Sequence, residues 1–274
     1  MLQTKGLTKQ FGGLTAVDSV DFRLEADELC SLIGPNGAGK TTFFNLLTGS
    51  LTPTDGTIEM RRDGDWVDIT DESPYETTLG GIHRSYQITN IFPMLTVLEN
   101  VRVAAQAHGG GDSWKLHRNA GSFEEYLEEA HEILDRVGLE QYADDAAENL
   151  SHGQKRNLEI AIALAGDPDI LLLDEPTAGV SSDGIGQIID LIENVAADHA
   201  VLLVEHNMDV VMGLSDRIAV LHQGSLIADD EPAAIRDSDA VQRAYLGGYE
   251  SDEETGDKDG ADTSQSTDGG TTAA

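Results

Sequence analysis

The chain has 274 residues, 39% of them hydrophobic, which suffices for one large domain or one domain plus a small subdomain. No apolar run approaches the ~18 residues that span a bilayer and the first residues hold no signal segment, so we expect a soluble, cytoplasmic chain whose membrane role would need a partner. Its 50 acidic and 17 basic residues give a net charge of -33, which excludes free nucleic acid as a partner over most of the surface.

The N-terminal part is predicted to consist of strands and one helix. Residues 7–34 hold β-rich stretches broken by Gly and Asp turns, and they end in a short apolar run that suits a buried strand feeding a loop. The only cysteine, Cys30, lies in that run, so it has no partner for an intrachain disulfide and is expected to be a buried strand residue. Residues 40–49 then predict a helix, and residues 56–70 predict a hairpin.

The middle of the chain changes to helical spacing. Residues 96–108 and 122–139 carry apolar side chains at helical intervals, and the glycine-rich stretch 109–122 between them reads as a loop. We therefore expect a helical subdomain, at about 88–152, inserted into an α/β core.

The remaining elements alternate between buried strands and helices. Residues 169–176 and 199–206 are apolar runs of strand length, and helical segments at about 154–165 and 184–197 separate them. This alternation predicts a parallel sheet covered by helices. Residues 217–228 predict a closing hairpin, which short helices follow.

The last part of the chain is acidic and rich in Gly, Ser and Thr, so we predict one folded domain over 1–247 and a disordered tail over 248–274.

The excess of acidic residues is spread along the whole chain and is not confined to the tail. This spread indicates adaptation to a cytosol of molar salt, where charge repulsion is screened within ~3 Å. The alternative is an ordinary acidic protein with an acidic tail.

The stretch GPNGAGKTT fits the phosphate-loop pattern completely and lies between a predicted strand and a predicted helix. Glycines let backbone N–H groups surround phosphate oxygens, and the helix N-terminus adds partial positive charge. Lys40 is expected to reach the β- and γ-phosphates, and Thr41 is expected to bind Mg²⁺. The predicted phosphate-binding residues are Gly34, Pro35, Asn36, Gly37, Ala38, Gly39, Lys40, Thr41 and Thr42.

Two acidic residues end the predicted strand at 169–176. Asp174 is placed to hold Mg²⁺, directly or through its water shell, and Glu175 is placed to orient or deprotonate an attacking water. The sequence therefore predicts a protein that hydrolyses a nucleoside triphosphate with the help of Mg²⁺. An N-K-x-D element, which a small GTPase would need, is absent from the sequence.

The stretch LSHGQ, residues 150–154, precedes an apolar-periodic helix and suggests a second phosphate contact. Ser151 and Gly153 put a hydroxyl and a bare backbone at the helix N-terminus. Helix capping alone would explain the serine.

Taken in order, the phosphate loop, LSHGQ and LLLDEP resemble the ATP-binding cassette (ABC) ATPases, over about residues 2–247. The resemblance implies a P-loop ABC ATPase core of α/β class with an antiparallel β subdomain and an inserted α-helical subdomain. It implies that Ser151, Gly153 and Gln154 bind the γ-phosphate of ATP held by another subunit, in a head-to-tail dimer. The usual signature has Gly where this chain has His152.

Three further residues match the family's pattern. Phe11 matches the aromatic that stacks on adenine, although a strand aromatic packed on the core is the alternative. Gln87 matches the glutamine that senses Mg²⁺ and water and links to the membrane partner, and His206 matches the switch histidine at the γ-phosphate. The family often has Leu-Asp where this chain has Val180 and Ser181, which puts that aspartate's contact in doubt.

Finer resemblance points to the ATPase subunits of branched-chain (hydrophobic) amino acid importers, carried by stretches such as LSHGQKRNLEIAIALA and VEHNMDVVMGLSDRIAVLHQG. Urea and short-chain amide importers share much of this pattern, and lipopolysaccharide-export cassettes are also relatives. Non-transport ABC ATPases and regulatory modules with little turnover fit less well. There is no long coiled-coil insert and only one phosphate loop, and Glu175 and His206 are both present.

The resemblance also implies partners. The second ATPase is either an identical copy or a paralogue, and integral membrane permeases bind the pair on the inner face of the cell membrane. An extracellular solute-binding protein takes part indirectly, and no nucleic acid is expected.

Overall fold

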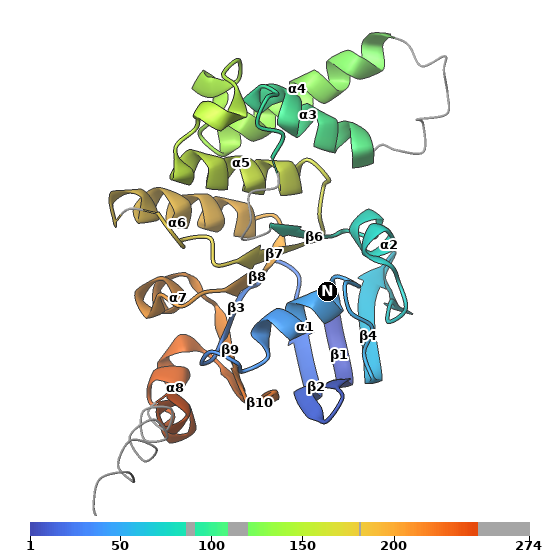
Figure 1. The fold of residues 1–274 in the computed structure, drawn as a ribbon, viewed down its shortest axis with the longest axis vertical. Helices are drawn as coiled ribbons and strands as arrows, with labels where there is room; N and C mark the ends of the chain where they lie inside the picture. Colours follow the sequence, from blue (N-terminus) through green and yellow to red (C-terminus); the bar gives the residue numbers. More distant parts are fainter. Residues whose placement is uncertain (86–90, 109–119, 181, 246–274) are drawn as a thin grey trace, which may run out of the picture.

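A computed structural model describes residues 1–85, 91–108, 120–180 and 182–245 of the chain (Figure 1). Within these residues the strands form two sheets, and helices cover both faces of the larger one. No helix among the described residues is long and apolar enough to cross a membrane.

The smaller sheet is antiparallel and has the strand order β2-β1-β4-β5. Its strands are β1 (Leu2–Phe11), β2 (Leu14–Leu24), β4 (Asp55–Arg62) and β5 (Asp65–Asp68). Alternate residues of β2 are buried near its end, as expected for a sheet with one face on the core and one toward water.

The larger sheet has the order β10-β9-β3-β8-β7-β6 and is parallel except for β10, which pairs antiparallel with β9. Its strands are β3 (Leu29–Ile33), β6 (Ile82–Ser85), β7 (Ile170–Asp174), β8 (Ala200–Val204), β9 (Arg217–His222) and β10 (Ser225–Asp230). Every residue of β3, β7 and β8 is buried, which explains their unbroken apolar runs.

The helices lie between and after the strands along the chain. They are α1 (Lys40–Leu47), α2 (Pro74–Leu79), α3 (Val97–His108), α4 (Ala120–Arg136), α5 (His152–Leu164), α6 (Ser182–Ala196), α7 (Met208–Leu214) and α8 (Pro232–Arg236). Two 3₁₀ turns, Glu140–Tyr142 and Ala147–Asn149, link α4 to α5, and residues 239–245 form a last helix.

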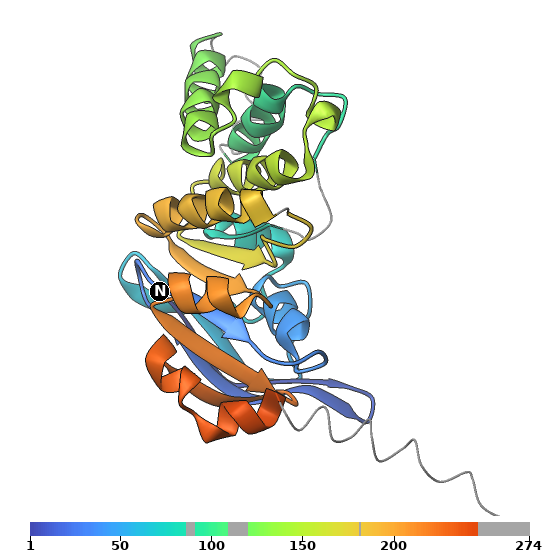
Figure 2. The ribbon, with the colours of Figure 1, turned by 90° about the vertical axis from the view of Figure 1, so that its left-hand side faces the viewer.

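Two large hydrophobic clusters pack on the two faces of the larger sheet, and a smaller third cluster joins β3 and β9 to α7 and α8. Because successive side chains of a strand point to opposite faces, Leu171 and Leu173 pack with α3, α4, α5 and α6, whereas Ile170 and Leu172 pack with α1 and the antiparallel sheet. Figures 1 and 2 both show α3, α4 and α5 gathered at one end of the molecule and the antiparallel sheet toward the other.

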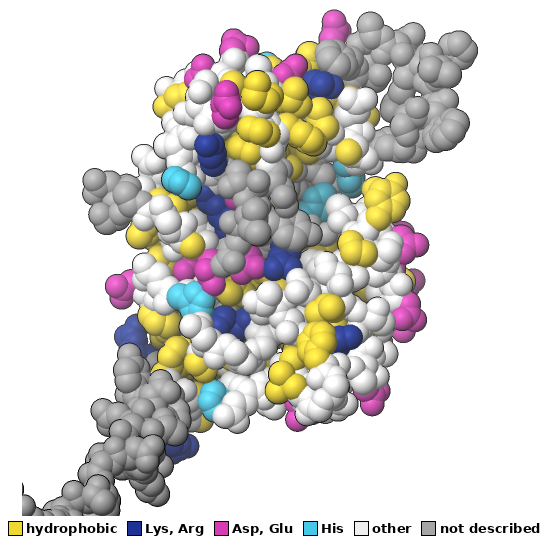
Figure 3. Space-filling view, viewed as in Figure 1, with side chains coloured by type: hydrophobic (Ala, Val, Ile, Leu, Met, Phe, Trp, Pro, Cys, Tyr) yellow, Lys and Arg dark blue, Asp and Glu magenta, His cyan; other side chains and the backbone are white. Residues whose placement is uncertain are grey.

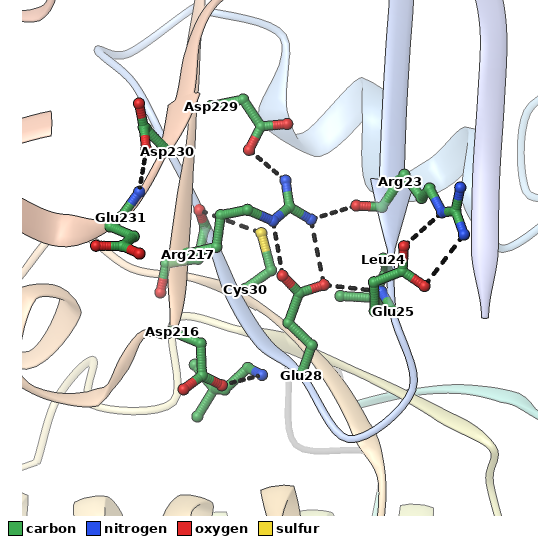
Figure 4. Close-up of polar contacts among 12 residues, drawn as sticks. Arg23, Leu24, Glu25, Glu28, Cys30, Asp216, Arg217, Asp229, Asp230 and Glu231 are labelled. Atoms are coloured by element: carbon green, nitrogen blue, oxygen red, sulfur yellow. Dashed lines mark hydrogen bonds and ion pairs between the residues drawn. The ribbon is translucent and has the colours of Figure 1, made fainter. Parts of the chain in front are cut away.

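A charged junction joins the two sheets at the amino ends of the parallel strands. Arg217, at the start of β9, donates from Nε to Glu28 Oε1 at 2.6 Å and also bonds Asp229 of β10 and the carbonyl oxygen of Arg23 on β2 (Figure 4). Cys30 lies beside this junction in β3 and is fully buried, so the prediction of a buried strand cysteine is confirmed. Burial raises the pKa of its thiol to about 12.

The predicted elements are confirmed with small shifts. Helix α4 begins at Ala120, inside the stretch expected to be loop, and ends at Arg136 because the chain turns at Gly138, whose φ is 71°. The short elements α2 and β6 were not predicted. They have only six and four residues, too few to give a clear periodic pattern. The predicted disordered tail and the predicted subdomain boundary near residue 88 lie outside the described residues and stay predictions.

Candidate nucleotide-binding site

The carboxyl ends of β3, β7 and β8 meet at one edge of the larger sheet, because these strands are parallel and β8 lies between the other two. The phosphate loop follows β3 there and leads into α1. The N-cap of α1 is Gly39, with a φ of 107°, and a Cβ atom on it would lie 2.4 Å from the Ala16 carbonyl oxygen. A residue with a side chain would therefore be strained and would clash.

Lys40 is the first residue of α1 and is buried. Its ammonium group donates to the carbonyl oxygens of Gly34 at 2.5 Å and Pro35 at 3.2 Å. Burial lowers the pKa of Lys40, and the nearby carboxylates of Glu175 and Asp174 partly offset this effect. The cation is thus held inside the loop, where an anion would meet it together with the helix N-terminus.

A cavity of about 660 Å³ lies over the loop, and its lining extends from β1 to the end of β8. Phe11 lies on its rim and is 46% exposed, so the alternative that this aromatic packs in the core is wrong. The predicted residues that line the cavity are Phe11, Asn36, Gly37, Ala38, Gly39, Lys40, Thr41, Thr42, Glu175 and His206. The sheet topology therefore brings together residues from four separate parts of the sequence.

Asp174, the last residue of β7, is buried and paired. Its Oδ2 atom lies 2.5 Å from a guanidinium nitrogen of Arg84 on β6, and its main-chain carbonyl accepts a hydrogen bond from Arg156 of α5. Arg84 also donates to Asn45 Oδ1 at 2.7 Å. Arginine side chains thereby hold both the carboxylate and the main-chain carbonyl of Asp174 in place.

A magnesium ion suits the available donors. Asp174 and Thr41 offer a carboxylate and a hydroxyl oxygen, which are hard ligands of the kind that Mg²⁺ prefers. Within the described residues, no group of three or more His, Cys, Asp and Glu side chains could hold a metal ion. Because Mg²⁺ usually keeps part of its water shell and takes further ligands from substrate phosphates, one carboxylate and one hydroxyl fit it.

Glu175 follows Asp174 and has a left-handed backbone, with a φ of 48°. Its N–H donates to the Val204 carbonyl oxygen at 2.8 Å, and its Oε1 atom lies 2.8 Å from Nε2 of His206. Figure 3 shows acidic, basic and histidine side chains gathered between the helices and the strands on this face. A carboxylate held toward the cavity in this way can accept a proton from water.

Ser151 is the N-cap of α5, so the capping interpretation is confirmed. Its Oγ atom accepts the Gln154 N–H at 3.3 Å, and Gln154 Oε1 accepts the Ser151 N–H at 2.8 Å. Ser151, Gly153 and Gln154 line a second cavity of about 770 Å³, beside α6, which shares no lining residue with the cavity over the phosphate loop. The phosphate loop and the LSHGQ stretch of one chain therefore line separate cavities.

Gln87, a predicted site residue, lies outside the described residues, as does Ser181, where the chain departs from the family's pattern. Conversely, sequence reasoning missed Arg84, Arg156 and Glu205, all three of which bond to the segments around Glu175 and His206. A signal existed for Glu205, because it is an acid at the carboxyl end of a buried strand, as Asp174 is. The two arginines carry no such signal, since their partners come from distant parts of the chain.

A scan of protein families matches residues 17–178, more than half of the chain, to the ABC transporter model. The chain belongs to the ABC transporter family. The high-affinity branched-chain amino acid transport ATP-binding protein LivG of Escherichia coli (strain K12) is 42% identical over 255 residues, covering 90% of this chain and 98% of that relative.

Solved ABC cassettes share the fold. The ADP conformation of MJ1267, an ATP-binding cassette of an ABC transporter, has a TM-score of 0.76 and 28% identity and covers 90% of this chain and 98% of that one. The dimeric structure of MJ0796, a bacterial ABC transporter cassette, has a TM-score of 0.71 and 29% identity over 85% and 99% of the two chains. This ABC protein is thus an ATP-binding ATPase with the cassette fold.

Proposed function

We propose that the chain is the ATP-hydrolysing subunit of an ABC importer that takes up branched-chain (hydrophobic) amino acids through separate membrane permeases. The observation that carries the ATPase assignment is the cavity over the phosphate loop, in which Glu175 and His206 meet opposite Lys40. The substrate class rests on similarity to LivG, whose name states branched-chain amino acid transport.

In this proposal the phosphates of ATP lie in the loop from Gly34 to Thr42 and the adenine stacks on Phe11. Thr41 and Asp174 would hold Mg²⁺, which when bound would neutralise phosphate charge, and Gln87 is proposed as part of the same metal and water site. Glu175 accepts the proton of the attacking water. His206, which contacts Glu175 at 2.8 Å, orients that carboxylate and contacts the γ-phosphate.

The separation of the two cavities supports a head-to-tail dimer with two ATP molecules at its interface. Ser151, Gly153 and Gln154 cannot complete the site of their own chain, since they line a different cavity, beside α6. They would complete the site of a second ATPase subunit, which is either identical or a paralogue. The related cassette MJ0796 is dimeric.

A groove of about 330 Å³ between α2, α3 and α5 is the proposed docking place for a permease. It is lined mainly by apolar atoms, and Tyr75 and Leu79 stand exposed at its edge, with exposed fractions of 70% and 44%. Exposed apolar groups of this kind mark interaction sites. The groove adjoins β6, whose residues Ile82, His83 and Arg84 line it, and Arg84 also pairs with Asp174 at the end of β7. We therefore propose that the protein lies on the inner face of the cell membrane, bound to the permeases.

The test is affinity purification of the Glu175→Gln variant from native membranes in molar KCl with ATP and Mg²⁺, followed by mass spectrometry. We expect multi-helix permeases and, for a heterodimer, a second ATPase. The Lys40→Ala variant, which is expected to bind ATP weakly, is the matched control. It shows which co-purified proteins depend on bound ATP. Recovery of soluble proteins or ribosomes alone would contradict the transporter assignment. A co-purified binding protein, titrated with leucine and with urea, decides between the amino acid and the amide class.

A further inference from the structure

Glu205 is a buried carboxylate between the two segments that carry Glu175 and His206. It follows β8 directly, and only 4% of the residue is exposed. It does not line the nucleotide cavity, although its neighbours Val204 and His206 do. A buried charge at this place needs an explanation, because an ionised side chain is costly to bury without strong hydrogen bonds.

Both carboxylate oxygens of Glu205 are used. Oε1 accepts the N–H of Thr177 at 2.9 Å and the hydroxyl of Thr177 at 2.6 Å. Oε2 accepts the N–H of His206 at 2.9 Å and the N–H of Asn207 at 3.3 Å. One side chain thus joins the loop after β7 to the loop after β8.

This link bears on the geometry of Glu175. The left-handed backbone at Glu175 is unfavourable for a residue with a side chain and persists only when its surroundings hold it. On the N-terminal side, Arg156 holds the Asp174 carbonyl oxygen, and on the C-terminal side Glu205 holds Thr177. The same carboxylate also fixes the main chain of His206, the residue that contacts Glu175.

We propose that Glu205 is a positioning residue for ATP hydrolysis, which keeps Glu175 and His206 in contact by tying together the two loops that carry them. The inference rests on the proposed role of Glu175 as the proton acceptor. Glu205 itself cannot take that part, because its two oxygens already accept four hydrogen bonds and lie away from the cavity. A glutamine cannot replace it, since its amide nitrogen would face two donors and could accept from neither.

The first test is Glu205→Gln, measured as steady-state ATP hydrolysis in molar KCl. We expect kcat to fall about 10- to 100-fold, because small misplacements of a catalytic group have effects of this size. KM for ATP and the affinity for ATP should stay within about twofold of wild type, since the phosphate loop is untouched. Glu193→Gln, which removes the same charge from an exposed position on α6, is the matched control and should leave kcat unchanged.

The second test is a double-mutant cycle with Thr177. Thr177→Val removes the hydroxyl donor to Glu205, whereas Thr177→Ser keeps it, so only the valine variant should lower kcat. Thr177→Val combined with Glu205→Gln should lose less than the product of the two single losses, because both changes break one link. If Glu205→Gln fails to fold, the valine and serine pair alone decides the question.

Three outcomes would overturn the proposal: an unchanged kcat in Glu205→Gln, an equal loss of ATP affinity and kcat, or losses that multiply in the double variant. Glu175→Gln, measured alongside, separates this inference from the proposed function. If Glu175→Gln stays active, the proposed role of Glu175 is wrong. If it is inactive while Glu205→Gln is normal, only the positioning role of Glu205 is wrong.

Discussion

His206 Nε2 lies 2.8 Å from Glu175 Oε1, at the carboxyl ends of the adjacent parallel strands β8 and β7. The contact fixes the direction of the carboxylate beside the nucleotide cavity. The neighbouring acid, Asp174, is instead paired with the guanidinium group of Arg84, so the two acids have different partners.

Glu175→Gln should lower ATP turnover about 10²- to 10³-fold, since an amide cannot accept the proton of water. ATP binding should persist, and the ATP-bound protein should elute as a dimer in size-exclusion chromatography. Phosphate release in molar KCl with Mg²⁺ measures the first effect. Glu128→Gln, at an exposed position of α4, is the control. Turnover at the wild-type rate would show that Glu175 is not the base.

Lys40→Ala should weaken ATP binding at least about tenfold, because a charge-assisted contact to phosphate is worth about 1.5–3 kcal/mol. Equilibrium titration with a fluorescent ATP analogue measures this effect. Lys5→Ala, which removes an exposed lysine paired with Glu59, should leave the affinity unchanged. Equal affinities for Lys40→Ala and wild type would contradict the phosphate-loop assignment.

Arg84→Met should destabilise the fold by about 3–5 kcal/mol, since it leaves the buried carboxylate of Asp174 without its cation. The side chains of Arg84 and Asp174 are only 7% and 10% exposed. Arg23→Met removes the exposed pair with Glu25 and should cost less than about 1 kcal/mol. Urea unfolding in molar KCl compares the two variants, and similar losses would contradict the distinction between buried and exposed pairs.

His83 should make stability fall at acidic pH. Its ring nitrogens lie 2.9 Å from the Ala163 carbonyl oxygen and 3.0 Å from that of Thr78. Burial lowers the pKa of His83 below its usual value of 6.5, and these two contacts only partly oppose the shift. The unfolded chain therefore binds more protons near that pH, so the contribution of His83 is present above it and is lost as the pH falls.

The measurement is Tm at pH 7.5 and pH 5.5 for wild type and His83→Gln. The difference in Tm between the two proteins should shrink at the lower pH. A difference that widens at pH 5.5 would mean that the two carbonyl oxygens favour the imidazolium, contrary to the stated direction.

Thermal stability should rise with KCl between 0.1 M and 2 M, because the net charge of -33 repels itself until salt screens it. We expect a gain in Tm of roughly 5–10 °C, which corresponds to a few kcal/mol for a chain of this size. Differential scanning calorimetry measures it, with an uncharged osmolyte as the control for water activity. A flat response would contradict salt adaptation.

Local features were predicted well from the sequence. The phosphate loop, the acids after β7 and the cap at Ser151 depend on neighbouring residues, whose backbone preferences are fixed by glycine, by apolar runs and by capping side chains. The short strand β6 and the ion pair between Arg84 and Asp174 were not predicted, because both depend on partners far away in the chain.

The sequence by itself determined a strand, a glycine-rich loop and a helix at residues 29–47, and an acidic pair at the end of a buried strand. Only the tertiary structure decided the strand order β10-β9-β3-β8-β7-β6, which brings His206 to Glu175 and Arg84 to Asp174 while it keeps Ser151 in a separate cavity. The physical reason is that strand order is set by the packing of whole buried faces, to which residues distant in sequence contribute together.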